Sequence, residues 1–328
     1  MSFLPAPIKR HGYMLSLVAA AVLGLLWPEP GSKGGVLHLD LITQLGVMLV
    51  FFLHGANLAP KNLRQGVTNW RLHLFVQAST YIVFPAIGAL IFFSARDLLP
   101  TDLLLGVFYL CALPSTITSS VAMTALARGN IAGAIFNATL SGLIGMLITP
   151  ALMSIVVSTT GKSLPLLPAI FGVMTTLLLP FVIGQILRPL LVNWLTRYKG
   201  VVTLLDRGVI VLIVYASFCE SSKAQVWSSY PLVSMALLFV ITALLLLAVL
   251  VATTWAARRL NFSTEDEIAA VFCGSKKSLA NGMPMANVLL AGHAGLGVLV
   301  LPMMIYHQLQ LLVCSVLAQR YARRLDKN

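Results

Sequence analysis

Two long hydrophobic segments of the chain are interrupted by polar residues at corresponding places in its two halves. The segment Leu103–Ala127 contains the run Pro114–Ser120, and the segment Ile268–Ala291 contains Gly274–Pro284 with two lysines. A helix that faces lipid cannot carry such groups at mid-depth without a large free-energy cost. Paired broken helices in the two halves of a membrane protein indicate the binding site of a transporter.

The other hydrophobic segments complete a count of ten membrane crossings, at about 20 residues each. Because each half holds five crossings, the second half enters the membrane in the opposite orientation, with the polar loop 163–168 at the midpoint. The pattern predicts an all-α integral membrane protein with a 5+5 inverted repeat, residues 1–160 and 161–328, in which broken helices 4 and 9 cross. The ten segments are Met14–Trp27, Leu39–Leu58, Leu72–Phe93, Leu103–Ala127, Ile131–Val157, Ala169–Trp194, the short Gly208–Cys219, Leu232–Trp255, Ile268–Leu290 and Leu296–Leu317.

The composition agrees with a chain that lies mostly in the bilayer. Of the 328 residues 58% are hydrophobic and only 10% are charged, whereas soluble domains are about 25% charged. No stretch outside the predicted spans is long enough for a catalytic or nucleic-acid-binding domain. The four cysteines lie in apolar surroundings without CxxC spacing, so buried thiols are expected and neither a disulfide nor a metal site is indicated.

The distribution of positive charge sets the orientation. Most of the 22 lysines and arginines fall in segments that the ten-span count places on one side, which the positive-inside rule makes cytoplasmic. Both termini are therefore expected in the cytoplasm, and the absence of an ectodomain favours a bacterial inner membrane. The net charge of +12 follows from this topology and needs no nucleic-acid partner.

Hydroxyl and amide side chains gather around the first break. They are Ser115, Thr116, Thr118, Ser119, Ser120 and Thr124 in the fourth segment, Asn137, Thr139 and Ser141 in the fifth, and Gln77 in the third. Asn137 and Ser141 are four residues apart and share one helical face. One interpretation is a shell of oxygen ligands for a cation or substrate. The alternative is hydrogen bonding between packed helices, where small hydroxyl residues are common.

Lys276 and Lys277 are the sharpest signal in the chain, and Ser275 and Ser278 flank them. An ammonium group at mid-membrane must be paired, be neutral or face a watery cavity. It would neutralise an anionic substrate, take the place of a bound sodium ion, or titrate during transport; the alternative is a salt bridge to Glu220. The N-termini of the half-helices add positive potential that favours an anion.

Several runs of residues resemble a known family, the bile acid:sodium symporters. The runs Ser119–Thr124, Gly129–Asn130, Ala134–Asn137 and Ile148–Pro150 resemble its fourth and fifth helices. A second group of motifs is similar to one divergent branch, represented in vertebrates by the seventh member of solute carrier family 10. These motifs are Phe272–Ser278, Gly282–Met285, Ala291–His293 and Ile305–His307.

The resemblance implies a panel domain of helices 1, 2, 6 and 7 and a core domain of helices 3–5 and 8–10. It also implies two sodium ions where helices 4 and 9 cross, and an organic anion between core and panel. Carried onto this chain, the two ion sites draw on several polar residues. The first site takes Ser119, Ser120, Thr124 and Asn137, and the second takes Gln77 and Ser275–Lys277.

The ninth segment departs from the symporter pattern. The symporters have a glutamate before a Gly-x-Gln-Asn stretch, whereas this chain has Phe272–Cys273, and Lys276–Lys277 in place of Gln-Asn. A like-charge contact at ~4 Å costs about 4 kcal/mol at an effective dielectric constant near 20. The hypothesis is therefore that a lysine replaces the bound cation and that coupling is sodium-independent or proton-linked.

The sequence thus predicts a secondary transporter of a bile-acid-like or sulfated organic anion that works by alternating access. Its predicted partners are this small solute and membrane lipid, with Na⁺ or H⁺ as coupling ion and no other cofactor; the oligomeric state is left open. The alternative is a non-transporting membrane regulator of calcium handling or of a partner complex. An enzyme is not indicated, because the sequence offers no nucleophile–base pair.

Overall fold

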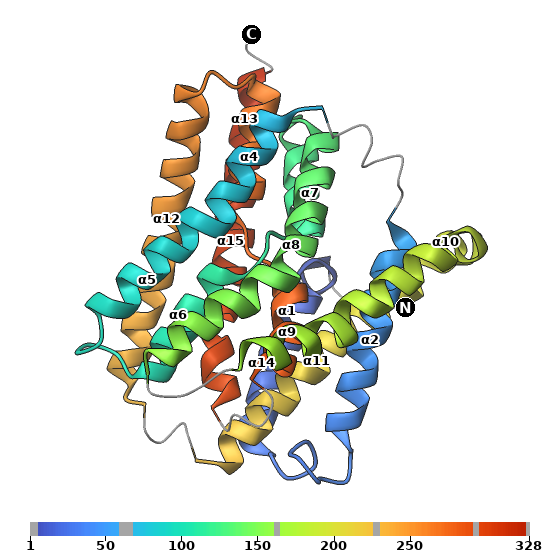
Figure 1. The fold of residues 1–328 in the computed structure, drawn as a ribbon, viewed down its shortest axis with the longest axis vertical. Coiled ribbons are helices and arrows are strands. Elements are labelled where there is room, and N and C mark those ends of the chain that lie inside the picture. The colour runs from blue at the N-terminus through green and yellow to red at the C-terminus, as the bar shows by residue number, and fades with distance from the viewer. Residues whose placement is uncertain (1–5, 59–67, 161–164, 226–229, 291–294, 326–328) are drawn as a thin grey trace. The chain divides into compact units, whose positions relative to one another are not determined.

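The computed structural model describes residues 6–58, 68–160, 165–225, 230–290 and 295–325, and these residues contain helices and no strand (Figure 1). The α-helices are α1 (Ala6–Leu26), α2 (Leu39–Asn57), α4 (Trp70–Ala78), α5 (Phe84–Ser94), α6 (Thr101–Ala112), α7 (Ile117–Leu126), α8 (Ile131–Ser158), α9 (Leu166–Val173), α10 (Leu179–Arg197), α11 (Lys199–Lys223), α12 (Leu232–Arg259), α13 (Thr264–Ser275), α14 (Leu279–Leu289) and α15 (Leu296–Leu325). Two short π-helices, η1 (Ser79–Val83) and η2 (Met174–Leu178), join α4 to α5 and α9 to α10.

The helices fit a protein that crosses a membrane several times. Within the described residues, seven helices are long and apolar enough to span, or eight if α6 and α7 count as one bent span. The all-helical membrane class predicted from the sequence is therefore confirmed, while the count of ten spans stays a prediction. The first two residues of the expected midpoint loop 163–168, Ser163 and Leu164, lie outside the described residues.

The seventh predicted segment is shorter than the helix that the structure shows at this place. The sequence pattern placed it at Gly208–Cys219, but α11 has 25 residues and extends across the charged pair Asp206–Arg207. Asp206 is accommodated because its carboxylate lies 3.1 Å from Nε2 of His54. A polar pair of this kind lets a helix continue where hydropathy alone indicates an end.

The helices form two compact units. The first unit comprises Met1–Leu58, Met174–Tyr230 and Met283–Val298, and the second comprises Ala59–Val173, Pro231–Gly282 and Leu299–Asn328. Helices α1, α2, α10 and α11 therefore belong to the first unit. Helices α4 to α9, α12, α13 and most of α15 belong to the second.

In the first unit, α10 packs against α2 at a very short distance. A Cβ atom added at Gly55 would overlap the backbone carbonyl of Phe181, and one added at Gly184 would overlap that of Phe52. Small residues permit this approach between membrane helices, where dispersion contacts rather than the hydrophobic effect hold helices together. An apolar cluster of residues from α2, α10 and α11 adds to this packing; it consists of Leu53, Ala56, Leu195 and Val202.

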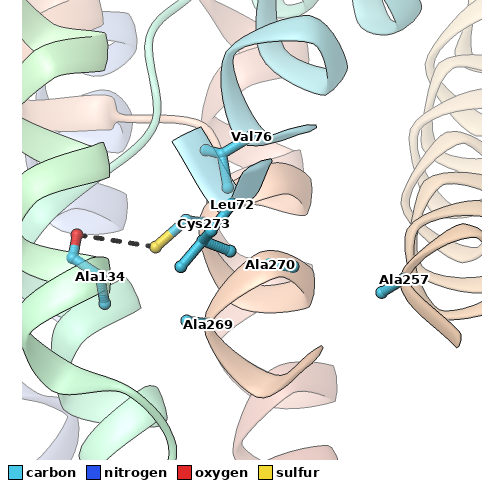
Figure 2. Packing of buried hydrophobic residues seen from close by; sticks show 7 residues of the cluster. All are labelled: Leu72, Val76, Ala134, Ala257, Ala269, Ala270 and Cys273. Carbon is cyan, nitrogen blue, oxygen red and sulfur yellow. Dashed lines mark hydrogen bonds between the residues drawn. The ribbon is translucent and has the colours of Figure 1, made fainter. Parts of the chain in front are cut away.

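In the second unit, α13 packs between α4, α8 and α12 through small side chains (Figure 2). The cluster consists of Leu72, Val76, Ala134, Ala257, Ala269, Ala270 and Cys273, all of them fully buried. The thiol of Cys273 lies 3.7 Å from the carbonyl oxygen of Ala134. All four cysteines are free and buried, as the sequence predicted. The packing places the C-terminal end of α13 deep inside this unit.

Both helix breaks are narrower than the sequence pattern indicated. The first covers only residues 113–116, and α6 and α7 meet at 57°. The second covers only residues 276–278, so Pro284 lies inside α14. Pro284 is the sixth residue of α14, where it removes the hydrogen bond that an N–H would donate to the carbonyl of Ala280. The hydroxyl of Ser278 begins α14 by accepting from the N–H of Asn281 at 3.1 Å. The polar runs therefore overestimated how much backbone is unwound.

Candidate functional site

The C-terminal end of α13 is the centre of a dense polar network in the second unit. The last four carbonyl groups of a helix have no N–H of a following turn to bond. In α13, each of these four carbonyl oxygens accepts a hydrogen bond from a side-chain hydroxyl of another element. These bonds are Ser120 Oγ to Phe272 O at 3.1 Å, Ser115 Oγ to Cys273 O at 2.7 Å, Ser79 Oγ to Gly274 O at 2.8 Å, and Tyr306 OH to Ser275 O at 2.7 Å. Two hydroxyls predicted to hold a cation or substrate, those of Ser115 and Ser120, thus cap the broken helix.

The ammonium group of Lys277 lies within a cage of three backbone carbonyl oxygens. Its Nζ donates to the oxygens of Leu113 at 2.7 Å, Cys111 at 2.8 Å and Thr80 at 3.1 Å. The ring of Phe84 covers it, with its centroid 4.1 Å from Nζ. The side chain is 1% exposed. All three N–H bonds of the ammonium are therefore used by uncharged acceptors.

Local backbone geometry explains why these carbonyls are available. Thr80 lies in η1, where a carbonyl bonds the N–H five residues ahead, but that position is Pro85, which has no N–H. Cys111 lies at the end of α6, and the N–H of Ser115, four residues ahead, donates instead to Oγ of Ser141 at 2.9 Å. The π-helix η1 and the break after α6 thus each leave a backbone carbonyl oxygen without a backbone partner, and both of these oxygens lie next to Nζ of Lys277.

Gln310 on α15 fixes the backbone of the same residue. Its Oε1 accepts from the N–H of Lys277 at 2.9 Å, and its Nε2 donates to the Lys277 carbonyl at 2.8 Å. Nε2 also lies 3.0 Å from Nδ1 of His307. Gln310 was not predicted as a site residue, because the sequence shows the amide but not its burial, and it is the burial in a membrane helix that indicates such a role.

Replacing Gln310 with methionine is expected to lower the free energy of unfolding by about 2 kcal/mol, because two buried backbone groups lose their partners. The melting temperature of the detergent-purified protein measures the change. Gln308→Met is the matched control, since Oε1 of Gln308 has no hydrogen-bond partner in the described part of the chain. A fall of equal size in both variants would mean that the paired amide of Gln310 contributes nothing specific.

Lys276 has a different environment from its neighbour. Its Nζ donates to the carbonyl oxygen of Ser119 at 3.0 Å and lies 5.7 Å from the centroid of the Phe272 ring. Glu220 accepts a hydrogen bond from the backbone N–H of Lys33. The alternative of a salt bridge between one of the two lysines and Glu220 stays a prediction, although the three N–H groups of Lys277 already donate to backbone carbonyl oxygens.

The remaining predicted site residues divide into two groups. The hydroxyl of Ser141 donates to Tyr81 and accepts from the N–H of Ser115. The hydroxyl of Ser275 donates to the Val271 carbonyl one turn back in α13, and Ser278 caps α14. Gln77 donates from Nε2 to the Asn137 carbonyl at 3.2 Å. In the described part of the chain, three buried oxygens of this group have no hydrogen-bond partner: Gln77 Oε1, Ser119 Oγ and Thr124 Oγ1. Buried oxygens without a partner are uncommon in folded proteins, and bound water or an ion is one way in which they are satisfied.

The first unit contains a polar pocket of about 420 Å³, within the usual size range of small-molecule sites. Lys33, Asp40, Gln44, Thr176, Glu220 and Asn287 are among the residues that line it. Of these residues, only Glu220 was among the site residues predicted from the sequence. Lys33 and Asp40 lie where the chain enters α2, so they resembled ordinary residues of a loop and of a first helical turn.

These features define an all-helical membrane protein in which one broken helix holds a buried ammonium group and one unit holds a polar pocket. The model of the SBF-like CPA transporter family matches residues 11–323, and the chain belongs to this family. The resemblance to bile acid:sodium symporters is therefore confirmed, and the family is one of transporters rather than enzymes.

Relatives match nearly the whole chain. An uncharacterised protein of Pseudomonas aeruginosa is 44% identical over 314 residues, which are 96% of this chain and 93% of that protein. Sodium/bile acid cotransporter 7-B of Xenopus laevis is 31% identical over 317 residues, 94% of this chain and 91% of that protein. Sodium/bile acid cotransporter 7 of Mus musculus is 30% identical over 313 residues, 94% and 92% respectively.

Proposed function

We propose that this protein is a secondary active transporter of a small organic anion, and that the ammonium of Lys277 serves as its permanently bound cation. The observation that carries the proposal is the cage of three carbonyl oxygens around Nζ, at 2.7–3.1 Å. Carbonyl oxygens of unwound backbone are the groups with which transporters coordinate monovalent cations. A tethered ammonium in their midst removes the need for a free ion.

Charge supports the same coupling scheme. A sodium ion placed beside a fixed ammonium meets a repulsion of about 4 kcal/mol at ~4 Å, and the hydroxyls of Ser115 and Ser120 already bond the backbone of α13. The three unsatisfied oxygens of Gln77, Ser119 and Thr124 remain as the proposed place for a water molecule or a proton-carrying group. The proposed coupling is thus sodium-independent or proton-linked.

The proposed architecture has ten spans, both termini in the cytoplasm and alternating access through movement of a core against a panel. The composition of the first unit supports this, because α1, α2, α10 and α11 correspond to the helices assigned to the panel. The proposed spans beyond the eight counted by length are α1 and the broken pair α13–α14. The cytoplasmic placement of both termini rests on the positive-inside argument, and a bacterial inner membrane is the proposed location.

The proposed solute contact is the polar pocket of the first unit. Lys33 supplies a positive charge for an anionic group, while Asp40 and Glu220 give the charged lining one net negative charge, which repels a dianion more strongly than a monoanion. This combination favours a solute with one negative charge and several hydroxyl groups over a dianion. Bile-acid-like and singly sulfated compounds satisfy that description.

Uptake by purified protein in proteoliposomes tests the proposal. The solute is chosen by a thermal-shift screen of taurocholate, steroid sulfates and smaller organic anions. Uptake is expected to proceed at the same rate in sodium, potassium and choline salts, because Lys277 needs no exchangeable ion. Lys33→Gln is expected to weaken the thermal shift, and Lys223→Gln, which removes a charge from outside the pocket lining, is the control. Uptake that requires sodium in the wild type would overturn the coupling scheme.

A further inference from the structure

A groove of about 820 Å³ runs between α12 and α15 in the second unit. Its apolar walls are Leu247, Leu250 and Val251 on α12 and Val313, Val316 and Leu317 on α15. The outer wall is open, since Leu247 and Val251 are 57% and 60% exposed and Val316 is 52% exposed. In a membrane protein, aliphatic residues with this exposure face hydrocarbon chains.

The groove changes from apolar to cationic along both helices in the same direction. On α12 the lining proceeds from Leu247 to Arg258 and Arg259, and on α15 it proceeds from Val313 to Arg320. At 1.5 Å per residue, Leu247 to Arg258 covers about 16 Å. That length equals about half of a hydrocarbon core of ~30 Å, which is one leaflet. The groove therefore has the length and polarity of a single phospholipid.

At the cationic end of the groove, specific contacts hold two of the three arginine side chains in place. Arg258 bonds the buried carboxylate of Glu267 at 3.0 Å, which fixes it beside the groove. Arg259 stacks over Trp255, with 5.6 Å from its Cζ to the ring centroid, and Arg320 is exposed on α15. Trp255 lines the groove beside these arginines, and tryptophan is enriched where membrane helices meet lipid headgroups.

We propose that this groove binds one anionic phospholipid, with an acyl chain along the aliphatic walls and the phosphate at Arg259 and Arg320. Basic pockets between membrane helices hold anionic headgroups, and each arginine near the surface adds about 1 kcal/mol. A lipid fits better than a soluble anion because most of the lining is aliphatic and open to the bilayer. The proposal does not depend on the transported solute or on the coupling ion.

Quenching of Trp255 by brominated lipids tests the proposal in bilayers of phosphatidylcholine with a fixed minor fraction of phosphatidylglycerol. The contribution of Trp255 is the difference between wild type and Trp255→Phe. It is expected to be quenched about fivefold more by brominated phosphatidylglycerol than by an equal mole fraction of brominated phosphatidylcholine. In Arg259→Gln/Arg320→Gln the ratio is expected to fall to about one.

The control Arg197→Gln/Lys199→Gln removes two exposed positive charges from the first unit and is expected to keep the preference of the wild type. Should the double groove variant not fold, Arg320→Gln alone is expected to lower the ratio part of the way. Equal quenching by both lipids in the wild type, or a preference that survives in Arg259→Gln/Arg320→Gln, would overturn the proposal. Absence of quenching by either lipid would also overturn it, because the groove would then be covered by protein such as a second copy of the chain.

Discussion

Replacing Lys277 with methionine is expected to make the stability of the protein depend on sodium or potassium. In choline salts the free energy of unfolding should fall by about 3 kcal/mol, because three buried carbonyl oxygens each lose a donor worth about 1 kcal/mol. A free cation can then enter the vacated cage and regain part of the loss. Melting temperatures in sodium, potassium and choline chloride measure both effects, and transport should become cation-dependent or cease.

Lys276→Met is the matched control for this experiment. It removes the neighbouring ammonium, which is also buried but, within the residues that the structure describes, bonds one carbonyl oxygen, that of Ser119. We expect a smaller loss of stability and no response to the cation. If Lys276→Met rather than Lys277→Met creates the cation response, the wrong lysine has been assigned to the ion's place. If neither variant responds, the carbonyl cage does not bind cations.

Replacing Gly55 with alanine is expected to lower the melting temperature by about 10 °C or more, which corresponds to more than about 3 kcal/mol for a chain of this size. The added Cβ would overlap the backbone carbonyl of Phe181. Backbone cannot rotate away as a flexible side chain does, so α2 and α10 must separate. Their separation also loosens the reciprocal contact of Gly184 with Phe52.

Gly208→Ala separates this steric effect from the general effect of adding a methyl group. Gly208 lies in α11 of the same unit, and nothing lies within 4 Å of the position of its Cβ. Alanine there is expected to be neutral or to stabilise the helix by about 0.5–1 kcal/mol. Equal melting temperatures for Gly55→Ala and Gly208→Ala would mean that α2 and α10 do not pack this closely in the bilayer.

The hydrophobic pattern predicted the membrane class and both broken helices because these depend on composition over windows of about 20 residues. It did not locate the ends of the breaks. Ser119 and Ser120 are polar yet lie in the first turn of α7, and Pro284 lies inside α14. Hydropathy measures the cost of placing a residue in lipid, whereas a helix end depends on which backbone groups find partners.

The two lysines were identified from the sequence because an ammonium group at mid-membrane is rare and costly. Their partners were not. The carboxylate of Glu220 was the alternative partner from the sequence, whereas the three acceptors of Lys277 are backbone oxygens of Thr80, Cys111 and Leu113. Any residue type supplies a carbonyl oxygen, so no pattern of side chains marks one as available. The one feature of the sequence related to these acceptors is Pro85, five residues after Thr80, because a proline has no N–H with which to bond the Thr80 carbonyl.

The sequence by itself determined that this is a membrane protein with paired helix breaks and with Lys276 and Lys277 in the second, because these features follow from local composition. The tertiary structure alone decided that Lys277 rather than Lys276 is enclosed by carbonyl oxygens and that Gln310 fixes its backbone. It also decided that Arg259 and Arg320 meet at one groove. These arrangements join residues from 33 to 197 positions apart within the lysine site, and packing, not local sequence, brings such residues together.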